Sequence, residues 1–214
     1  VNDYSTTVPM LQALDLGTAT PIVRVPWNEP GIIGKMLDAG AMGIVIPMVN
    51  TVAEAEAAVR ACRYAPAGAR SYGPTRAAMR VDGYYEAAND AVACIPMIET
   101  TQAISNIGDI LAVPGIDAVY VGPADLSITL GLPPGNNDDS ADFMSALETI
   151  VEACQHQGVV AGIHATTALV SKRLDMGFGM VTATSDMVAM RAGLAPAVAT
   201  VPGGDADADD GAIY

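Results

Sequence analysis

Short apolar runs rich in valine and isoleucine recur along the chain, and a longer stretch with the hydrophobic spacing of a helix follows most of them. The runs are continuously apolar instead of alternating, which is typical of parallel strands buried on both faces. Glycine follows several of the predicted helices, where a C-cap is expected. The pattern predicts an α/β fold in which strands and helices alternate. The predicted strands are residues 21–26, 43–48, 92–99, 118–122, 159–164 and 179–185.

Two architectures fit this alternation, a barrel and a doubly wound sheet. No GxGxxG motif follows a predicted strand and no GxxxxGK[ST] motif occurs, so the nucleotide-binding forms of the doubly wound sheet lack their usual evidence. The sequence therefore favours a (β/α)8 TIM barrel, whose active groups lie where strands end. Because such a barrel has eight strands and six are predicted, we expect its first two β/α units to precede Val1.

Composition narrows the class of protein further. The barrel domain is predicted to span residues 1–201, and residues 202–214 form an acidic tail rich in glycine and aspartate. A formal charge of −14 repels nucleic acid and anionic lipid, and no apolar run is long enough to span a membrane. Cys62, Cys94 and Cys154 lie far apart without a zinc-type pattern, so we expect reduced thiols in a cytoplasmic protein.

Charged residues within or after the predicted strands are candidates for chemistry. Arg24 lies inside an apolar run, where a buried guanidinium needs a carboxylate partner or an anionic substrate. Glu99 ends the third run and Asp125 follows the fourth, so their strands would lie roughly 5 Å apart. Such a pair suits a hard divalent cation, Mg²⁺ or Mn²⁺, although either acid alone could instead cap a helix.

Amine catalysis is a second route to carbonyl chemistry in a barrel, and it needs a lysine on a strand. The chain has two lysines, Lys35 and Lys172, and both lie in predicted helices. The sequence therefore disfavours a Schiff-base mechanism.

Four segments carry a family resemblance when they are taken together and in order. They are "PIVRVPWNEPGIIGKMLDAGAMGIVIPMV", "RYAPAGARSYGPTRA", "PMIETTQAISNI" and "GPADLSITLG". The chain resembles the HpcH/HpaI aldolase family of metal-dependent pyruvate aldolases. The resemblance implies a decorated (β/α)8 barrel, assembled as a homo-oligomer, usually a hexamer, whose last helix packs on a neighbour.

The resemblance also implies a reaction, the reversible cleavage of a 4-hydroxy-2-oxo acid into pyruvate and an aldehyde through a metal-stabilised pyruvate enolate. Glu99 and Asp125 correspond to the ligands of the divalent cation, which would be Mg²⁺, Mn²⁺ or Co²⁺. Arg24 corresponds to the arginine that binds the keto oxygen of pyruvate and stabilises the enolate. The small-molecule partners would be pyruvate and an aldehyde.

Residues around the fourth strand end correspond to the carboxylate site of the family. Gly122 and Pro123 shape a turn, and the amides of Ala124 and Asp125 at the following helix start would bind the pyruvate carboxylate. Each of these residues is therefore a candidate substrate contact.

Other residues of the family's site fall elsewhere in the chain. Asp38 corresponds to an acid that pairs with the catalytic histidine, and Arg70 lies in a loop near the aldehyde portion of the substrate. We expect that histidine just before Val1. Of the histidines present, His156 has the pattern of a solvated helix residue. His164 ends the fifth apolar run without a counterpart in the family pattern, so it is either a substrate contact or a packing residue.

Alternative functions stay open at this point. An acyl-CoA lyase of the citramalyl or malyl type, or an oxaloacetate-decarboxylating condensing enzyme, would use the same metal and enolate. A non-catalytic assembly protein would fold without metal and show no turnover.

Overall fold

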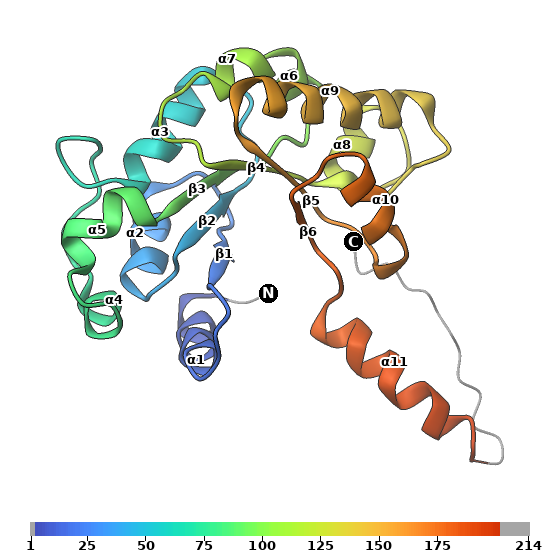
Figure 1. The fold of residues 1–214 in the computed structure, drawn as a ribbon, viewed down its shortest axis with the longest axis horizontal. Helices are drawn as coiled ribbons and strands as arrows, with labels where there is room; N and C mark the ends of the chain where they lie inside the picture. Colours follow the sequence, from blue (N-terminus) through green and yellow to red (C-terminus); the bar gives the residue numbers. More distant parts are fainter. Residues whose placement is uncertain (1–2, 202–214) are drawn as a thin grey trace.

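The computed structural model describes residues 3–201 of the 214-residue chain (Figure 1). The acidic tail predicted at residues 202–214 lies outside the described residues. All of the predicted strands are present, and each is shorter than its apolar run. They are β1 Ile22–Arg24, β2 Gly43–Ile46, β3 Ala93–Pro96, β4 Ala118–Val121, β5 Val160–Ile163 and β6 Met180–Val181.

The strands lie side by side in chain order and every pair is parallel. One sheet has the order β1-β2-β3 and the other the order β4-β5-β6. An isolated parallel bridge between Met97 and Tyr120 joins them, and the Ile98 amide donates to the Tyr120 carbonyl at 3.0 Å. The α/β fold is therefore confirmed. A closed barrel is not formed by residues 3–201, in which β1 and β6 are edge strands.

Helices follow the strands and cover one side of them, as Figure 1 shows for α3, α6, α7 and α9. The stretch with helical spacing that follows the third predicted strand, residues 100–115, forms two helices, α6 and α7. They are divided at Asn106, whose backbone leaves the helical region and whose side chain donates to the Asn50 carbonyl at 2.8 Å. The helices are α1 Tyr4–Leu14, α2 Pro30–Asp38, α3 Val52–Cys62, α4 Thr75–Arg80, α5 Tyr84–Ala91, α6 Thr101–Ser105, α7 Ile107–Leu111, α8 Pro123–Thr129, α9 Ala141–Gln157, the 3₁₀ turn η1 Thr167–Leu169, α10 Val170–Asp175 and α11 Asp186–Val198.

The strands have two different faces because successive side chains alternate. On the helix-covered face, residues such as Ile44, Ile46 and Val119 belong to the large core that also includes helix residues. On the opposite face, which we call the inner face, a separate and smaller apolar cluster contains Val45, Ile95, Met97, Ala118 and Tyr120. A residue just after a strand that continues the alternation of the inner-face residues therefore points its side chain toward the inner face, which the helices do not cover.

Helix starts are defined by local capping chemistry. Thr51 and Glu54 form a capping box at the start of α3, and the Ser140 hydroxyl caps α9. Three helices, α2, α9 and α10, are followed by a glycine with positive φ, which is 110° at Gly40, 70° at Gly158 and 102° at Gly177. Each β/α unit is thus bounded by residues that lie close to it in the sequence.

Candidate active site

Two carboxylates lie at the carboxyl ends of neighbouring strands. Glu99 follows β3 and is buried, with 1% of its surface exposed. Asp125 lies in the first turn of α8, directly after β4, and is exposed. Because the Met97–Tyr120 bridge pairs these two strands, both acids are at the same end of the sheet, as their order in the sequence indicated.

Neither acid is a helix cap, so the alternative explanation for them is wrong. Helix α6 is capped by the Thr100 hydroxyl, which accepts from the Ala103 amide at 3.0 Å, and Glu99 precedes this cap. The N-cap residue of α8 is Gly122, which has no side chain to cap the helix. The two carboxylates are therefore free of the structural role that most often explains an acid at a helix start.

The two oxygens of Glu99 have different surroundings. Oε1 accepts from the Met48 amide at 2.8 Å. Oε2 is buried and has no hydrogen-bond partner among the described residues. Burial raises the pKa of Glu99 and the charge of Asp125 raises it further, while the Met48 amide and Arg24 lower it. A buried carboxylate oxygen without a partner is costly, so the site lacks a positive group beside Oε2.

A divalent cation fits this requirement. It would contact Oε2 and would also screen Glu99 from Asp125. Residues 3–201 contain no group of three or more His, Cys, Asp or Glu side chains that could hold a metal. Two carboxylates with water and substrate oxygens in the remaining positions are typical of Mg²⁺ and Mn²⁺ sites and not of zinc sites.

Gly122 allows Glu99 to occupy its position. A Cβ atom at Gly122 would lie 2.4 Å from Glu99 Oε2 and 2.9 Å from the Met97 methyl carbon. Its φ of −95° is accessible to any residue, so close approach is the reason for glycine here and not backbone conformation. The sequence indicated a turn at Gly122 but not this contact.

Met48 is a residue of the site that sequence reasoning missed. Its φ of 57° places it in the left-handed region, where a residue with a side chain other than Asn or Asp is uncommon. This conformation accompanies the donation of its amide to Glu99. Methionine is not associated with left-handed backbone, so no sequence signal could have indicated the role.

The start of α8 presents two amides at the same end of the sheet. Pro123 occupies the first helical turn and has no amide hydrogen, and the first helical backbone bond runs from the Leu126 amide to the Gly122 carbonyl. In the described part of the chain the amides of Ala124 and Asp125 make no backbone hydrogen bond. Free amides at a helix start attract an anion such as a carboxylate.

The burial of Arg24 and its place in the strand differ from the prediction. It was expected in the middle of a buried strand, but it is the last residue of β1, an edge strand, and it is exposed. No ion pair of Arg24 is formed within residues 3–201. It pairs in register with Val45, a residue of the inner face, and its charge lowers the pKa of Glu99. The guanidinium thus belongs to the carboxyl end of the sheet without being locked to a protein carboxylate.

Asp38 and Arg70 lie at the other end of the sheet. Asp38 is the last residue of α2, which follows β1 and packs against β2, so it lies near the amino end of the strands, roughly 13 Å from the start of that nine-residue helix. Arg70 is buried, donates to Asp38 at 2.7 Å and to the Tyr84 hydroxyl at 3.0 Å, and stacks on the Tyr64 ring with 4.4 Å to the centroid. Within one chain these residues are not brought together with Glu99 and Asp125.

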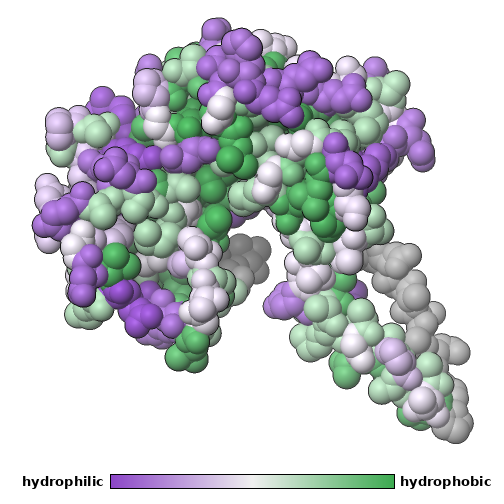
Figure 2. Space-filling model, viewed as in Figure 1, coloured by the Kyte–Doolittle hydropathy of each residue, from purple (hydrophilic) through white to green (hydrophobic). Residues whose placement is uncertain are grey.

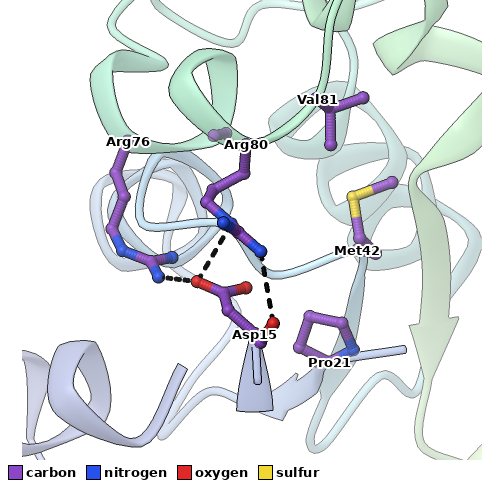
Figure 3. A pocket seen from close by; sticks show the side chains of 8 residues that line it. Asp15, Pro21, Met42, Arg76, Arg80 and Val81 are labelled. Carbon is purple, nitrogen blue, oxygen red and sulfur yellow. Dashed lines mark hydrogen bonds and ion pairs between the residues drawn. The ribbon is translucent and has the colours of Figure 1, made fainter. Parts of the chain in front are cut away.

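A pocket also lies at the amino end, between the end of α1 and α4 (Figure 3). Its charged side chains are already paired, since Asp15 accepts from Arg76 and, at 3.2 Å, from the Arg80 Nε atom. Pro21 and Met42, which precede β1 and β2, form another wall. Because the charges satisfy one another and the candidate carboxylates are at the opposite end, this pocket is not a candidate for the chemistry.

The two lysines, the predicted surface histidine and the cysteines lie away from the two carboxylates in the described structure, on helices or in the core. Lys35 is exposed on α2 and Lys172 lies on α10, so neither is on a strand. His156 is exposed on α9, as predicted. Cys62, Cys94 and Cys154 are buried free thiols. No helix among the described residues has the length and hydrophobicity to cross a membrane.

An open parallel α/β sheet with two carboxylates and free helix amides at its carboxyl end defines an enzyme-like site, and comparison identifies its class. The chain belongs to the HpcH/HpaI aldolase/citrate lyase family, whose model matches residues 2–192. The resemblance seen in the sequence is thereby confirmed.

Individual proteins of known activity or structure are similar to the chain over most of its length. A hydroxypyruvate/pyruvate aldolase of Rhizorhabdus wittichii is 42% identical over 192 residues, which are 89% of this chain and 76% of that protein. A 4-hydroxy-2-oxo-heptane-1,7-dioate aldolase of Klebsiella pneumoniae is 38% identical over 181 residues, covering 82% and 68%. The crystal structure of a family member from Burkholderia cenocepacia superimposes with a TM-score of 0.85 at 30% identity and covers 93% of this chain and 80% of its own.

Proposed function

We propose that the chain is a metal-dependent pyruvate aldolase that reversibly cleaves a 4-hydroxy-2-oxo acid into pyruvate and an aldehyde. The observation that carries the proposal is the buried Oε2 atom of Glu99, which has no partner in residues 3–201 and lies close enough to Asp125 for their charges to interact. The aldolase names of relatives 38–42% identical to the chain support the same reaction class.

The residues divide the work between binding and charge stabilisation. Glu99 and Asp125 would hold the divalent cation, Mg²⁺ or Mn²⁺, which supplies Lewis-acid charge for the enolate when bound. The amides of Ala124 and Asp125 bind the substrate carboxylate at the start of α8. Arg24, which is not held by a protein carboxylate in the described structure, binds the keto oxygen and adds a positive charge where negative charge develops.

The larger architecture is also part of the proposal. The parallel strands in chain order, with helices on one side, correspond to strands of a (β/α)8 barrel. Since Asp38 lies at the amino end of the strands, away from Glu99 and Asp125 of the same chain, its proposed contact with a catalytic histidine would join two different chains. A cytoplasmic location stays a prediction, in keeping with the free thiols.

Helix α11 supports assembly into a homo-oligomer, for which the family resemblance suggests a hexamer. It extends away from the strands (Figure 1), and Figure 2 shows hydrophobic residues along it. No residue of α11 is buried, and Met190 and Leu194 are 56% and 57% exposed. Such an apolar helix is stabilised by packing on another copy. Light scattering should therefore give a mass several times the 21.9 kDa of the chain, and a single-chain mass would contradict the assembly.

Removal of divalent metal should abolish the activity. Pyruvate release from 4-hydroxy-2-oxo acids, measured with a coupled lactate dehydrogenase assay, should disappear after treatment with a chelator and return with Mg²⁺ or Mn²⁺. The physical reason is that Glu99, Asp125 and the developing enolate bring negative charge together, which the single charge of Arg24 does not balance. Undiminished turnover in chelator would contradict the metal role, and strict dependence on a coenzyme A ester would favour the acyl-CoA lyase alternative.

A further inference from the structure

The strand register places four residues in one row across the carboxyl end of the sheet. Met97 pairs with Tyr120, Tyr120 pairs with Gly162, and Gly162 pairs with Met180. The residues two positions later in each segment form a second row, parallel to the first, whose side chains face the same side of the sheet. It consists of Glu99, Gly122, His164 and Thr182.

Contacts in the structure support this row. The closeness of Gly122 to Glu99 Oε2 confirms that the positions after β3 and β4 are level with each other. The His164 amide donates to the Val121 carbonyl at 3.1 Å, so the ladder between β4 and β5 continues through His164. Alternation then directs His164 to the inner face, which Gly162 and Tyr120 share.

The imidazole of His164 is a polar group in this row that nothing in the described structure uses. It is half-buried, and no hydrogen bond to it is formed within residues 3–201. Thr182, its neighbour in the row, differs in this respect because its hydroxyl is bonded to the Tyr120 hydroxyl. Burial lowers the pKa of His164, which keeps the imidazole neutral at neutral pH.

Its position suits the part of the substrate beyond the reacting carbons. Neighbouring strands are about 4.8 Å apart, so His164 is roughly 5 Å from Gly122 and roughly 10 Å from Glu99 at the backbone. A 2-oxo acid bound between Glu99 and the start of α8 and extended along the row would advance by about 1.2 Å for each carbon–carbon bond. The side chain of His164 therefore reaches the carbons that come from the aldehyde.

We propose that His164 is a specificity-determining residue that binds a hydroxyl group on the aldehyde portion of the substrate. The inference rests on the proposed aldolase function and names its substrate class as hydroxyaldehydes. A neutral imidazole has one donor and one acceptor nitrogen, which matches a hydroxyl group, whereas it lacks the charge that would neutralise a carboxylate. A buried site built for a hydroxyl discriminates strongly against an analogue without it.

The test compares glycolaldehyde with propionaldehyde, which have the same number of non-hydrogen atoms and differ by the hydroxyl group. The ratio of kcat/KM for aldol addition of pyruvate to the two aldehydes should favour glycolaldehyde in the wild type. In His164→Leu this ratio should fall about tenfold or more, and in His164→Gln, which keeps a donor and an acceptor, it should fall less. His156→Leu, which changes an exposed histidine on α9, is the matched control and should keep the wild-type ratio.

Separate results distinguish this inference from the function on which it rests. Exchange of the pyruvate methyl protons with D2O in the presence of Mg²⁺ or Mn²⁺ requires enolate formation but no aldehyde. A wild type that shows no exchange overturns the aldolase function and this inference together. Exchange in the wild type, combined with no preference for glycolaldehyde or an unchanged ratio in both His164 variants, overturns the role of His164 alone.

Discussion

Replacing Glu99 by glutamine is expected to reduce pyruvate formation more than about 100-fold while the fold is retained. Glutamine preserves the shape of the side chain and can still accept from the Met48 amide, but it removes the negative charge that would hold the cation. The measurement is kcat/KM for pyruvate release at saturating Mg²⁺, with circular dichroism as a check of the fold. Glu56→Gln, an exposed change on α3, is the matched control and should retain activity.

In the absence of metal, Glu99→Gln should leave the stability of the fold unchanged or raise it, although it lowers activity. The pKa of Glu99 is raised in the folded state, chiefly by burial. The folded protein therefore binds the proton more tightly than the unfolded chain, and stability is lost as the pH rises above 4.5 and through the folded pKa. At neutral pH, metal-free Glu99→Gln should melt at a temperature at least as high as that of the wild type. Lower stability of the variant, with activity unchanged, would mean that Glu99 is a structural acid.

Replacing Gly122 by alanine is expected to lower activity about 100-fold by moving Glu99 instead of removing it. The added Cβ would lie 2.4 Å from Glu99 Oε2, which is shorter than a van der Waals contact and is a steric clash. Glu99 would have to rotate away, which would weaken its bond from the Met48 amide and misplace the oxygen that the cation needs. The effect should appear as a higher concentration of Mg²⁺ required for half-maximal activity, in addition to a lower kcat.

Gly108→Ala is the matched control for this substitution. Gly108 lies on the exposed side of α7, and a Cβ there meets no atom within 4 Å. Alanine in that helix should stabilise the fold by about 0.5–1 kcal/mol and leave the Mg²⁺ requirement unchanged. Full activity of Gly122→Ala at wild-type Mg²⁺ concentrations would contradict the close packing of Gly122 against the Glu99 site.

Much of the framework could be read from local patterns. The apolar runs indicated the strands, and the glycines indicated the helix ends, because strand burial and left-handed C-caps depend on residues that are near one another in the chain. The stretch with helical spacing after the third predicted strand does not form one continuous helix, since Asn106 divides it into α6 and α7. The break is accompanied by a bond to the Asn50 carbonyl, a contact between distant segments that no local pattern contains.

Among the charged residues, too, local sequence indicated some positions, and tertiary contacts decided others. Glu99 and Asp125 lie after buried strands, as the sequence indicated, because an acid directly after an apolar run is a local signal, and the parallel order of β3 and β4 brings the two acids to one end of the sheet. Arg24 was expected to be buried because its neighbours are apolar, but burial depends on what lies beside the strand, and β1 is an edge strand in the described structure.

By itself, the sequence determined the order of the strands and helices, the family, and the acids that follow β3 and β4. Only the tertiary structure decided that the Met48 amide holds one oxygen of Glu99, that Gly122 makes room for the other, and that Arg70 is buried against Asp38 at the opposite end of the sheet. The physical reason is that hydrophobic period and capping act over a few residues. Close approach, burial and hydrogen-bond partners are set by segments dozens of residues apart that meet only when the sheet has formed.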